Sequence, residues 1–177
     1  MFLIQHYNTI LKYDLISKMY YTNKIEINKL NKIILNITSK HLIQNKEEIL
    51  SLLFAIELLS GQKGVVTKVK KSISNFKIKK KMNLGCKLIL IDEHMYNFLN
   101  YIIITLPKIN DFNIIKKNNL KNGILSIGLI NILIFLDIEY KYAKFVNLYG
   151  INLTFIPKNI NNLDAQFLLN GFQFPIK

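Results

Sequence analysis

Hydrophobic residues in the first twenty positions recur every three or four residues. Ile4, Tyr7, Leu11, Leu15 and Met19 therefore share one face of a helix. The pattern predicts an N-terminal helix that ends near residue 20.

A different pattern occupies the range from Lys29 to Thr38. Ile33, Leu35 and Ile37 alternate with positions that are more polar on average, among them Asn36. A period of two is typical of a β-strand, because successive side chains point to opposite faces of a sheet. We expect a strand with one apolar side and one side available to a polar partner.

The next segment returns to helical spacing. Asn45 and Glu48 are three residues apart, which resembles a capping box at a helix start. Gly61 suits the left-handed residue that ends many helices. The predicted helix places four apolar residues on one face: Ile49, Leu52, Leu53 and Ile56.

Two strand-like pieces follow, Val65 to Lys70 and Phe76 to Ile78, joined by a polar stretch from Ser72 to Asn75. A third, Lys87 to Ile91, leads into a helix whose predicted cap is Asp92. That helix should bury Met95, Leu99, Ile102 and Leu106, and it should end at Pro107.

The last third of the chain begins with a polar, loop-like stretch from Lys108 to Asn122. Short strands are expected at Ile124 to Ile127, Ile132 to Phe135 and Ile151 to Ile156. A final helix should begin near Asn162, carry Leu163, Phe167 and Leu168, and close at Gly171.

The order of these elements predicts the fold class. Several gaps between strands are too short for a crossover helix, which favours antiparallel pairing. We expect an α+β fold with a mostly antiparallel sheet, helices packed on one face and a basic hairpin extension. The chain shows no internal repeat and no linker rich in Ser, Gly or Pro. One domain over residues 1–177 is therefore predicted, with an N-terminal helix and linker at 1–28 and a basic hairpin region at 61–87.

Composition excludes several classes of protein. Half of the 177 residues are hydrophobic, which is enough for a core. Cys86 is the single cysteine, so a disulfide framework and a cysteine-rich zinc site are excluded. His6, His41 and His94 are too scattered for metal-ligand spacing, and no metal or cofactor is expected. The composition, rich in Ile, Asn and Lys, matches what AT-rich codons encode.

The chain is also not expected to insert into a membrane. Its most apolar run, Ile124 to Leu136, has 13 residues and includes Ser126, Gly128 and Asn131. Spanning a bilayer takes roughly 20. Met1 to Ile4 lead straight into the helical pattern, which predicts no secretory signal.

Positive charge is concentrated in one stretch. The chain has 24 basic residues, all lysine, against 11 acidic ones, giving a net charge of +13. Between Glu57 and Asp92 there is no acidic residue, and the range from Gly61 to Lys87 holds nine lysines: Lys63, Lys68, Lys70, Lys71, Lys77, Lys79, Lys80, Lys81 and Lys87. Val65, Val66 and Phe76 are interleaved with them. A patch built into the fold in this way favours a polyanionic partner, with RNA, DNA and anionic lipid all open.

The same stretch resembles a known family. The segment from Gly61 to Ile78, with its Gly-Gln-Lys-Gly start and its Ser-Ile-Ser-Asn-Phe-Lys core, resembles the central signature of the bacterial-type large ribosomal subunit protein five, which binds 5S ribosomal RNA. Further matching blocks occur in order along the chain. They are Gly85-Cys86-Lys87, Met95 to Leu99, Leu106-Pro107-Lys108 with Asp111-Phe112, Ile134 to Tyr140 and Gly150 to Thr154. The resemblance runs from roughly Leu30 to Pro175.

The resemblance implies a structural, non-enzymatic protein of the central protuberance of the large ribosomal subunit. Its implied partners are 5S rRNA, large-subunit rRNA, the P-site tRNA elbow, small-subunit protein thirteen and neighbouring central-protuberance proteins. The composition and the absence of a presequence add the expectation of an organelle-encoded version, located in the mitochondrial matrix ribosome. A plastid or the cytoplasm of an AT-rich bacterium is the alternative source.

Site residues carry over by position. Asn36 and Gln62 match family residues that contact 5S rRNA, and amides both donate and accept hydrogen bonds, which suits 2′-hydroxyls and base edges. The full set of implied rRNA contacts is Asn36, Gln62, Lys63, Thr67, Lys68, Lys70 and Lys87. The hairpin that corresponds to the tRNA-contacting loop supplies Lys71, Ser72, Asn75, Lys77, Lys79, Lys80 and Lys81, whose lysines act as point charges for phosphate.

The chain departs from the family pattern in places. Gly64 stands where the family has proline, and Ile89 replaces a polar threonine. Two other classes of function stay open beside the ribosomal one. A peripheral membrane protein would use the lysine-rich hairpin on anionic lipid, and an RNA-modifying enzyme would need a pocket with a pKa-shifted group.

Overall fold

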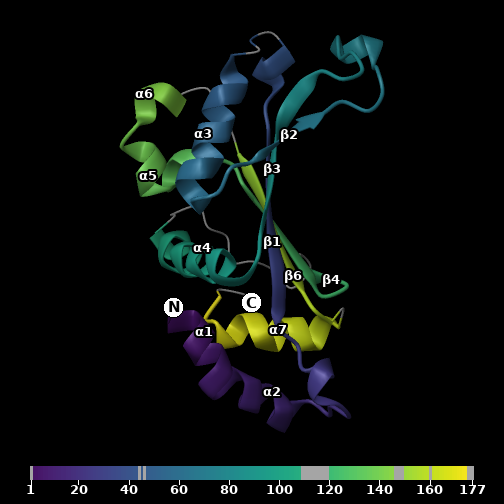
Figure 1. Ribbon diagram of the computed structural model, residues 1–177, viewed down its shortest axis with the longest axis vertical. Helices are drawn as coiled ribbons and strands as arrows, with labels where there is room; N and C mark the ends of the chain where they lie inside the picture. Colours follow the sequence, from purple (N-terminus) through teal and green to yellow (C-terminus); the bar gives the residue numbers. More distant parts are fainter. Residues whose placement is uncertain are drawn as a thin grey trace. The chain divides into compact units, whose positions relative to one another are not determined.

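The computed structural model describes residues 2–43, 45, 47–108, 120–145, 150–159 and 161–174 (Figure 1). Its helices are α1 (Phe2–His6), α2 (Lys12–Lys18), α3 (Glu48–Ser60), α4 (Asp92–Thr105), α5 (Leu136–Glu139), α6 (Tyr142–Phe145) and α7 (Asn162–Gly171). Its strands are β1 (Leu30–Thr38), β2 (Val65–Lys68), β3 (Asn83–Leu90), β4 (Leu120–Lys121), β5 (Ile124–Leu129) and β6 (Ile151–Pro157). A π-helical turn (Tyr7–Leu11) joins α1 to α2, so the predicted N-terminal helix is confirmed with a local widening.

The six strands form a mostly antiparallel sheet in the order β2-β3-β1-β6-β5-β4. In the β2–β3 pair Val65 lies opposite Lys87, and in the β4–β5 pair Leu120 lies opposite Leu125. The predicted α+β class is confirmed. The sheet order places β3 between β2 and β1, so the strand that bears Asn36 is the direct neighbour of β3, the second strand of the basic hairpin region.

The described chain divides into two compact units, each discontinuous in sequence. The first contains residues 1–33, 90–127 and 154–177, and the second contains residues 34–89 and 128–153. Each unit has its own buried apolar residues. Strands β1, β3, β5 and β6 contribute residues to both.

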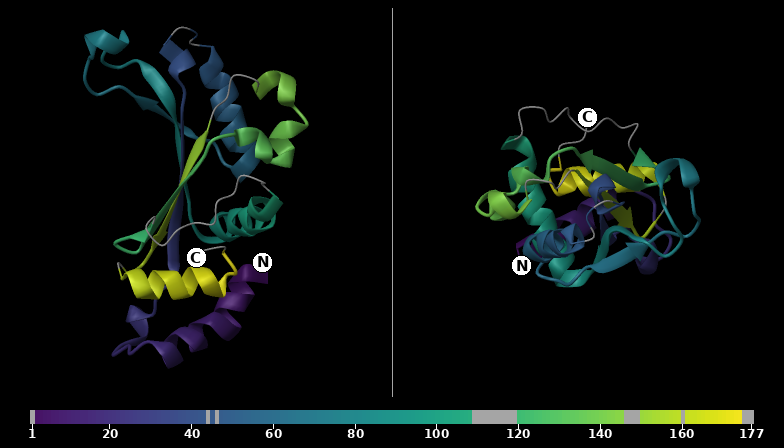
Figure 2. Two further views of the ribbon diagram at one scale, coloured as in Figure 1. Left: turned by 180° about the vertical axis from the view of Figure 1, so that it is seen from behind. Right: turned by 90° about the horizontal axis from the view of Figure 1, so that it is seen from above.

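Helices α2, α4 and α7 supply the core of the first unit. Leu11, Leu15 and Leu168 are buried, and α2 runs beside α7 in both side views (Figures 1 and 2). The ring of Phe172 lies 6.4 Å from that of Tyr7 and 6.0 Å from that of Tyr96. These rings connect the N-terminal segment to α4 and to the residue after α7.

In the second unit, α3, α5 and α6 lie together on one side of the strands (Figure 2, left). Leu52 and Ile56 of α3 are fully buried, as are Leu35 and Ile37 of β1. The helix ends at Gly61, whose φ of 68° is the left-handed conformation expected at that position.

Two predicted strands are wrong. The sequence pattern predicts a strand over Phe76 to Ile78, but Ser74–Phe76 form a 3₁₀ turn and Ile78 makes only an isolated bridge with Ile73. The polar residues before Phe76 favour a turn over pairing.

The second wrong prediction is the strand at Ile132 to Phe135. Ile132–Ile134 form a 3₁₀ turn and α5 begins at Leu136. The Asn131 carboxamide oxygen accepts the N–H of Leu133 at 2.9 Å, which starts the turn. A short apolar run does not by itself distinguish a strand from a buried helical turn.

Several boundaries differ by a few residues. Helix α3 begins at Glu48 rather than Asn45, although the Asn45 amide donates to the Glu48 carboxylate at 3.3 Å. Ile91, not Asp92, occupies the cap position of α4. The predicted loop from Lys108 to Asn122 contains β4, and its residues 109–119 lie outside the described chain. In α7, Leu168 is buried while Leu163 and Phe167 are exposed.

Candidate nucleic-acid interface

The basic hairpin region contains β2 and most of β3, and the hairpin itself joins these two strands in the second unit. The two strands pair from Val65 opposite Lys87 to Lys68 opposite Asn83, with an irregularity between Thr67 and Lys68. Beyond it the chain stays paired, because Val69 N–H donates to Met82 at 2.9 Å and Lys81 N–H donates to Val69 at 3.0 Å. Backbone hydrogen bonds thus continue between the two arms of the hairpin beyond the ends of β2 and β3.

The tip of this region is closed by its own hydrogen bonds. Ile73 and Ile78 exchange backbone bonds of 2.9 and 3.1 Å across the tip. The N–H of Lys77, a residue with φ of 55°, donates to Ser74 at 2.9 Å. Lys80 N–H donates to the Ser72 hydroxyl oxygen at 3.2 Å, so Ser72 supports the hairpin backbone.

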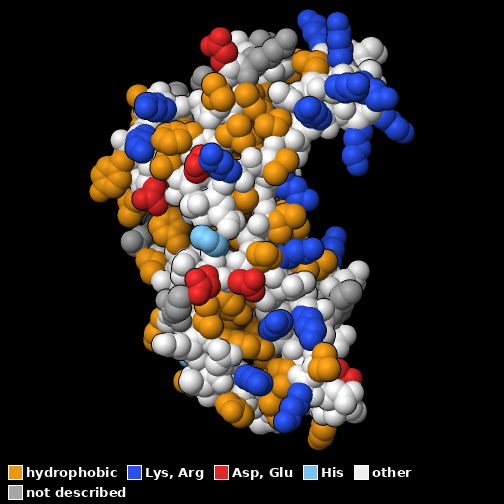
Figure 3. Space-filling view, viewed as in Figure 1, with side chains coloured by type: hydrophobic (Ala, Val, Ile, Leu, Met, Phe, Trp, Pro, Cys, Tyr) orange, Lys and Arg blue, Asp and Glu red, His pale blue; other side chains and the backbone are white. Residues whose placement is uncertain are grey.

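All nine lysines of the region are exposed. Lysines gather over the hairpin at the upper right of Figure 3, where they form a blue cluster. No acidic residue occurs between Glu57 and Asp92 in the sequence, so no residue of the hairpin itself offsets this charge. Such a surface attracts phosphate through Coulomb interaction and counterion release.

The open face of the sheet adjoins the hairpin in the second unit. On β1, Asn36 is half-buried between buried Leu35 and Ile37, so its amide lies on the face away from the core. On β2 and β3, Thr67 and Lys87 share the open face with exposed Val65, which lies opposite Lys87, while Cys86 is fully buried. The β-sheet alternation thus brings three of the predicted contacts to one face.

The remaining predicted contacts lie along the entry to the hairpin. Gln62 is half-buried, and its backbone is held by Ser60, whose hydroxyl accepts the Gln62 N–H at 3.2 Å and donates to its carbonyl at 3.1 Å. Exposed Lys63 follows. Gly64 lies against α3, where an added Cβ would be 3.3 Å from Ile56 Cγ2.

The other predicted contacts are exposed farther along the hairpin. Lys68 and Lys70 lie at the junction of strand and hairpin, and Lys71, Asn75 and Lys77 lie nearer the tip.

Two features of the surface were missed from the sequence. Phe76, at the tip, keeps 66% of its side chain exposed. A hollow of about 370 Å³ is lined by Leu42, Lys79, Lys80, Lys81, Met82 and Asn83. The signal for Phe76 was present, as an aromatic residue inside a lysine-rich, acid-free run, but the strand-like pattern around it did not single it out.

Comparison with known proteins covers nearly the whole chain. The family model described as Ribosomal protein L5 matches residues 23–79, and the model for the C-terminus of the same ribosomal family matches residues 83–176. The chain belongs to the ribosomal L5 family. The family assignment expected from the hairpin signature is therefore confirmed.

Individual ribosomal L5 relatives agree. Large ribosomal subunit protein uL5m of Reclinomonas americana is 41% identical over 174 residues, 97% of this chain and 96% of the relative. Protein uL5c of Euglena gracilis is 37% identical over 159 residues, 89% of this chain and 88% of the relative. Protein uL5 of Syntrophus aciditrophicus is 34% identical over 165 residues, 92% and 91% of the two chains. Of these three, the two organellar-type proteins share more identity with this chain than the bacterial one.

As a ribosomal L5 protein of the large-subunit uL5 type, the chain is a structural component and not an enzyme. Ribosomal RNA and the ribosome are its partners in general terms. Within the described ranges no group of three or more His, Cys, Asp or Glu residues could hold a metal ion. Over the same part of the chain, no helix combines the length and the apolar character needed to cross a bilayer.

The buried thiol of Cys86 is chemically quiet in this ribosomal L5 fold. Burial raises its pKa to about 11, so the reactive thiolate is scarce at neutral pH. Its side chain is completely buried, so Cys86 is a small core residue of β3.

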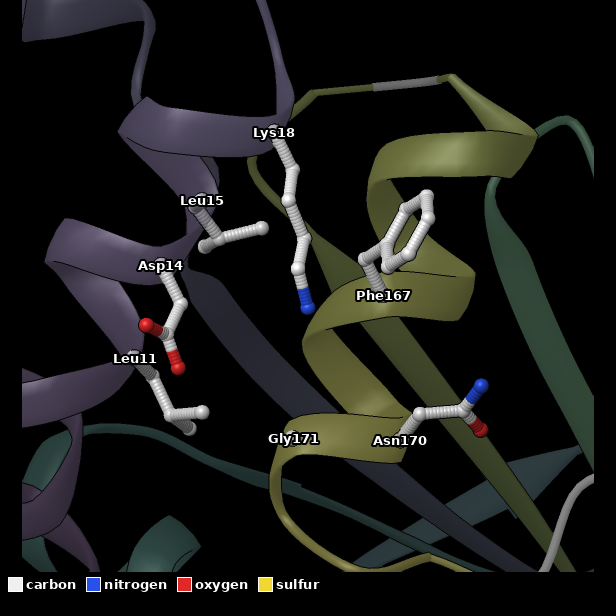
Figure 4. A pocket seen from close by; sticks show the side chains of 7 residues that line it. All are labelled: Leu11, Asp14, Leu15, Lys18, Phe167, Asn170 and Gly171. Atoms are coloured by element: carbon white, nitrogen blue, oxygen red, sulfur yellow. The ribbon is translucent and has the colours of Figure 1, made fainter.

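A second hollow, of about 300 Å³, lies in the first unit between α2 and α7 (Figure 4). The Lys18 ammonium points into it beside Phe167, 5.6 Å from the ring centroid, and Asp14 lies one turn earlier on α2. The lysine therefore makes a cation–π contact with the aromatic ring at this hollow.

Proposed function

We propose that this chain is a structural constituent of the central protuberance that holds 5S rRNA and large-subunit rRNA through the open face of β2, β3 and β1. The observation that carries the proposal is the continuity between that face and the hairpin with nine exposed lysines. Phosphate binding by lysine positions an RNA, and polar side chains on an adjacent sheet face read its sugars and bases.

The rRNA contacts proposed are Asn36, Gln62, Lys63, Thr67, Lys68, Lys70 and Lys87. Asn36 and Thr67 offer hydrogen-bonding groups on the open face, and Lys87 lies beside them with a charge for phosphate. Gln62 is held at the start of the hairpin by Ser60, so its amide side chain extends from a fixed backbone. An arginine-free site lacks the bidentate fork of guanidinium, so affinity here rests on point charges and amides.

The hairpin is proposed to contact the elbow of the P-site tRNA. Its contacting residues would be Lys71, Ser72, Asn75, Lys77, Lys79, Lys80 and Lys81. The hydrogen-bonded tip supports this role, because an ordered hairpin can reach a partner without losing further backbone entropy. Small-subunit protein thirteen and neighbouring proteins of the central protuberance complete the proposed partners.

The proposed location is the mitochondrial matrix ribosome. The 41% identity to the uL5m protein of Reclinomonas americana supports it. The 37% identity to a uL5c protein keeps a plastid source as the alternative, and the bacterial uL5 relatives keep an AT-rich bacterium.

Anionic lipid is the second candidate partner for the hairpin. Exposed apolar side chains among the lysines favour it, since 46% of Ile73 and 69% of Val65 remain exposed. Basic surfaces that carry apolar side chains also bind the membrane interface. Lipid binding of this kind would persist in the presence of excess RNA.

The test is to purify the protein with its native assembly at gentle salt and to sequence every RNA that accompanies it. A 5S species together with large-subunit rRNA supports the proposal in full. Large-subunit rRNA without 5S rRNA would assign Asn36 and Gln62 to another RNA segment, and recovery without any rRNA would overturn the proposal.

The residue-level test compares Asn36→Ala with Asn100→Ala, a matched change at an exposed amide of α4. Only Asn36→Ala should weaken binding of 5S rRNA.

A further inference from the structure

We propose that Phe76 is a stacking platform for an unpaired nucleobase of the RNA that the hairpin binds. This inference rests on the proposed RNA-binding function and adds a base-recognising residue to a surface otherwise made of lysines and small polar side chains. Three observations carry it: a tip closed by its own hydrogen bonds, an exposed aromatic ring on that tip, and exposed lysines on both sides of it.

The tip is closed by hydrogen bonds within the chain itself. The paired bonds between Ile73 and Ile78 close it, and the 3₁₀ turn Ser74–Phe76 is ended by the bond from Lys77 N–H to Ser74. Phe76 is the last residue of that turn, so its backbone is fixed by the local hydrogen bonds. A ring on a fixed backbone loses little conformational freedom when a base stacks on it.

Phe76 is exposed where burial would be expected. Two-thirds of its side chain faces solvent, although the core of the second unit buries Phe135 and Phe145 almost completely. A large aromatic ring left in water gains when a second flat apolar surface covers it. A flat partner suits it, because a flat surface covers the most area of an exposed ring.

The charge around the ring selects the class of partner. The neighbouring side chains are exposed lysines on both sides of the tip, including Lys71, Lys77 and Lys79. Lysines attract the phosphates of any nucleic acid and carry no base information. An aromatic ring beside a lysine-lined backbone track is the arrangement by which proteins bind unpaired nucleotides, because every base offers a π-face.

A stacking role for Phe76 predicts a preference for RNA with unpaired bases. In a duplex both faces of each base are covered by its neighbours, whereas bases in loops and bulges can be splayed out. Phe76 should distinguish the two, while the lysines should bind both in proportion to phosphate density.

The experiment compares the full-length wild-type chain with Phe76→Leu, Phe76→Tyr and Phe2→Leu. Two RNA probes are used, a stem–loop with an unpaired loop and a fully paired duplex with the same number of phosphates. Phe2 is also strongly exposed, at 73%, but lies in the first unit, so Phe2→Leu is the matched control. Circular dichroism and denaturant midpoints establish that all variants fold alike.

Phe76→Leu should weaken stem–loop binding by up to about 5- to 150-fold, the range that alanine substitution gives for one base–aromatic stack. Phe76→Tyr should keep wild-type affinity, and duplex binding should be the same in all four proteins. The salt slope should be unchanged in Phe76→Leu, because stacking releases no counterions.

Three outcomes would overturn the inference. Equal loss on stem–loop and duplex would mean that Phe76 only shapes the hairpin. Unchanged RNA binding with lost binding to phosphatidylcholine vesicles containing phosphatidylserine would assign the ring to a membrane surface. Wild-type protein that binds neither RNA would overturn the proposed function itself, and the stacking role with it.

Discussion

Gly85 of β3 lies directly against the carbonyl oxygen of Ile37 on β1. A Cβ at this glycine would collide with that oxygen and would also lie 2.9 Å from Thr38 Cγ2. The neighbouring atoms include backbone, which cannot move aside without shifting a strand. The close approach fixes how β3, the strand that carries Lys87, sits beside the strand that carries Asn36.

Gly85→Ala should therefore destabilise the fold. Overpacking of this kind costs about 1–3 kcal/mol in the free energy of unfolding. The control is Gly128→Ala, where a Cβ would meet only the Asn152 side-chain oxygen at 3.3 Å, an atom that can rotate away. Urea denaturation should show a clearly lower midpoint for Gly85→Ala than for Gly128→Ala. Equal midpoints would show that β3 and β1 separate at little cost.

The lysine triplet of the hairpin should set the salt dependence of RNA binding. If about half of the nine lysines meet phosphates, the log–log slope of affinity against salt should be near −3 to −4. Replacing Lys79, Lys80 and Lys81 by alanine removes three exposed charges and should flatten the slope.

The control variant replaces three lysines of the first unit, Lys12, Lys24 and Lys29, by alanine. It has the same net charge as the hairpin variant. Its slope should match wild type when both are measured by fluorescence anisotropy over a salt series. A slope that stays steep in the hairpin variant would mean that the triplet does not touch RNA.

Cys86 should resist alkylation while the protein is folded. Its side chain is fully buried, and burial raises its pKa to about 11, so both access and thiolate formation oppose reaction at pH 8. Because the chain has one cysteine, iodoacetamide labelling followed by intact-mass measurement reports on a single site. Labelling should be fast in guanidinium and at least tenfold slower in native buffer. Comparable rates would show that β3 opens readily in the native state.

Tyr96 should make the fold sensitive to alkaline pH. Burial, together with the nearby Tyr7 and Asp92, raises its pKa to about 12, against about 10 in an unfolded chain. The native state therefore holds this proton more tightly, so the stabilisation is complete below pH 10 and is lost as the pH rises from 10 to about 12. A shift of this size corresponds to ~2–3 kcal/mol.

The lysines also lose charge in this range, so the informative comparison is with Tyr96→Phe. Wild type should lose more stability than Tyr96→Phe between pH 9 and pH 12, when both are followed by urea denaturation at each pH. Parallel loss in the two proteins would mean that the hydroxyl of Tyr96 reaches solvent in the native state.

The periodic parts of the sequence predicted the structure well. The predicted apolar face of β1 is fully buried at Ile33, Leu35 and Ile37. The predicted face of α4 is buried at Met95, Leu99 and Ile102, of which Met95 keeps 1% of its surface exposed. A helix that buries one face repeats its apolar residues about every 3.6 positions, and a strand repeats them every two positions. The spacing of apolar residues therefore predicts the conformation of these segments.

Short segments without a repeat could not be predicted in the same way. Ile78 pairs with Ile73 through one isolated bridge, but the 3₁₀ turn at Ser74–Phe76 replaces the predicted strand, and the predicted strand at Ile132 gives way to a turn started by the side chain of Asn131. Each outcome is decided by one hydrogen-bonding partner, and composition alone does not show which partner is used. The same limit applies to Phe76, whose exposure follows from the turn around it.

The sequence by itself determined the family, the α+β class and the location of the excess positive charge, because colinear motifs, burial periods and charge runs are properties of the chain order. Tertiary structure alone decided which of those residues share a surface. Alternation along β1, β2 and β3 brings Asn36, Thr67 and Lys87 to one open face, and the absence of a side chain at Gly85 allows the strands to lie that close. A turn closed by Ile73 and Ile78 then leaves Phe76 in solvent, because backbone pairing rather than side-chain hydrophobicity sets where the tip points.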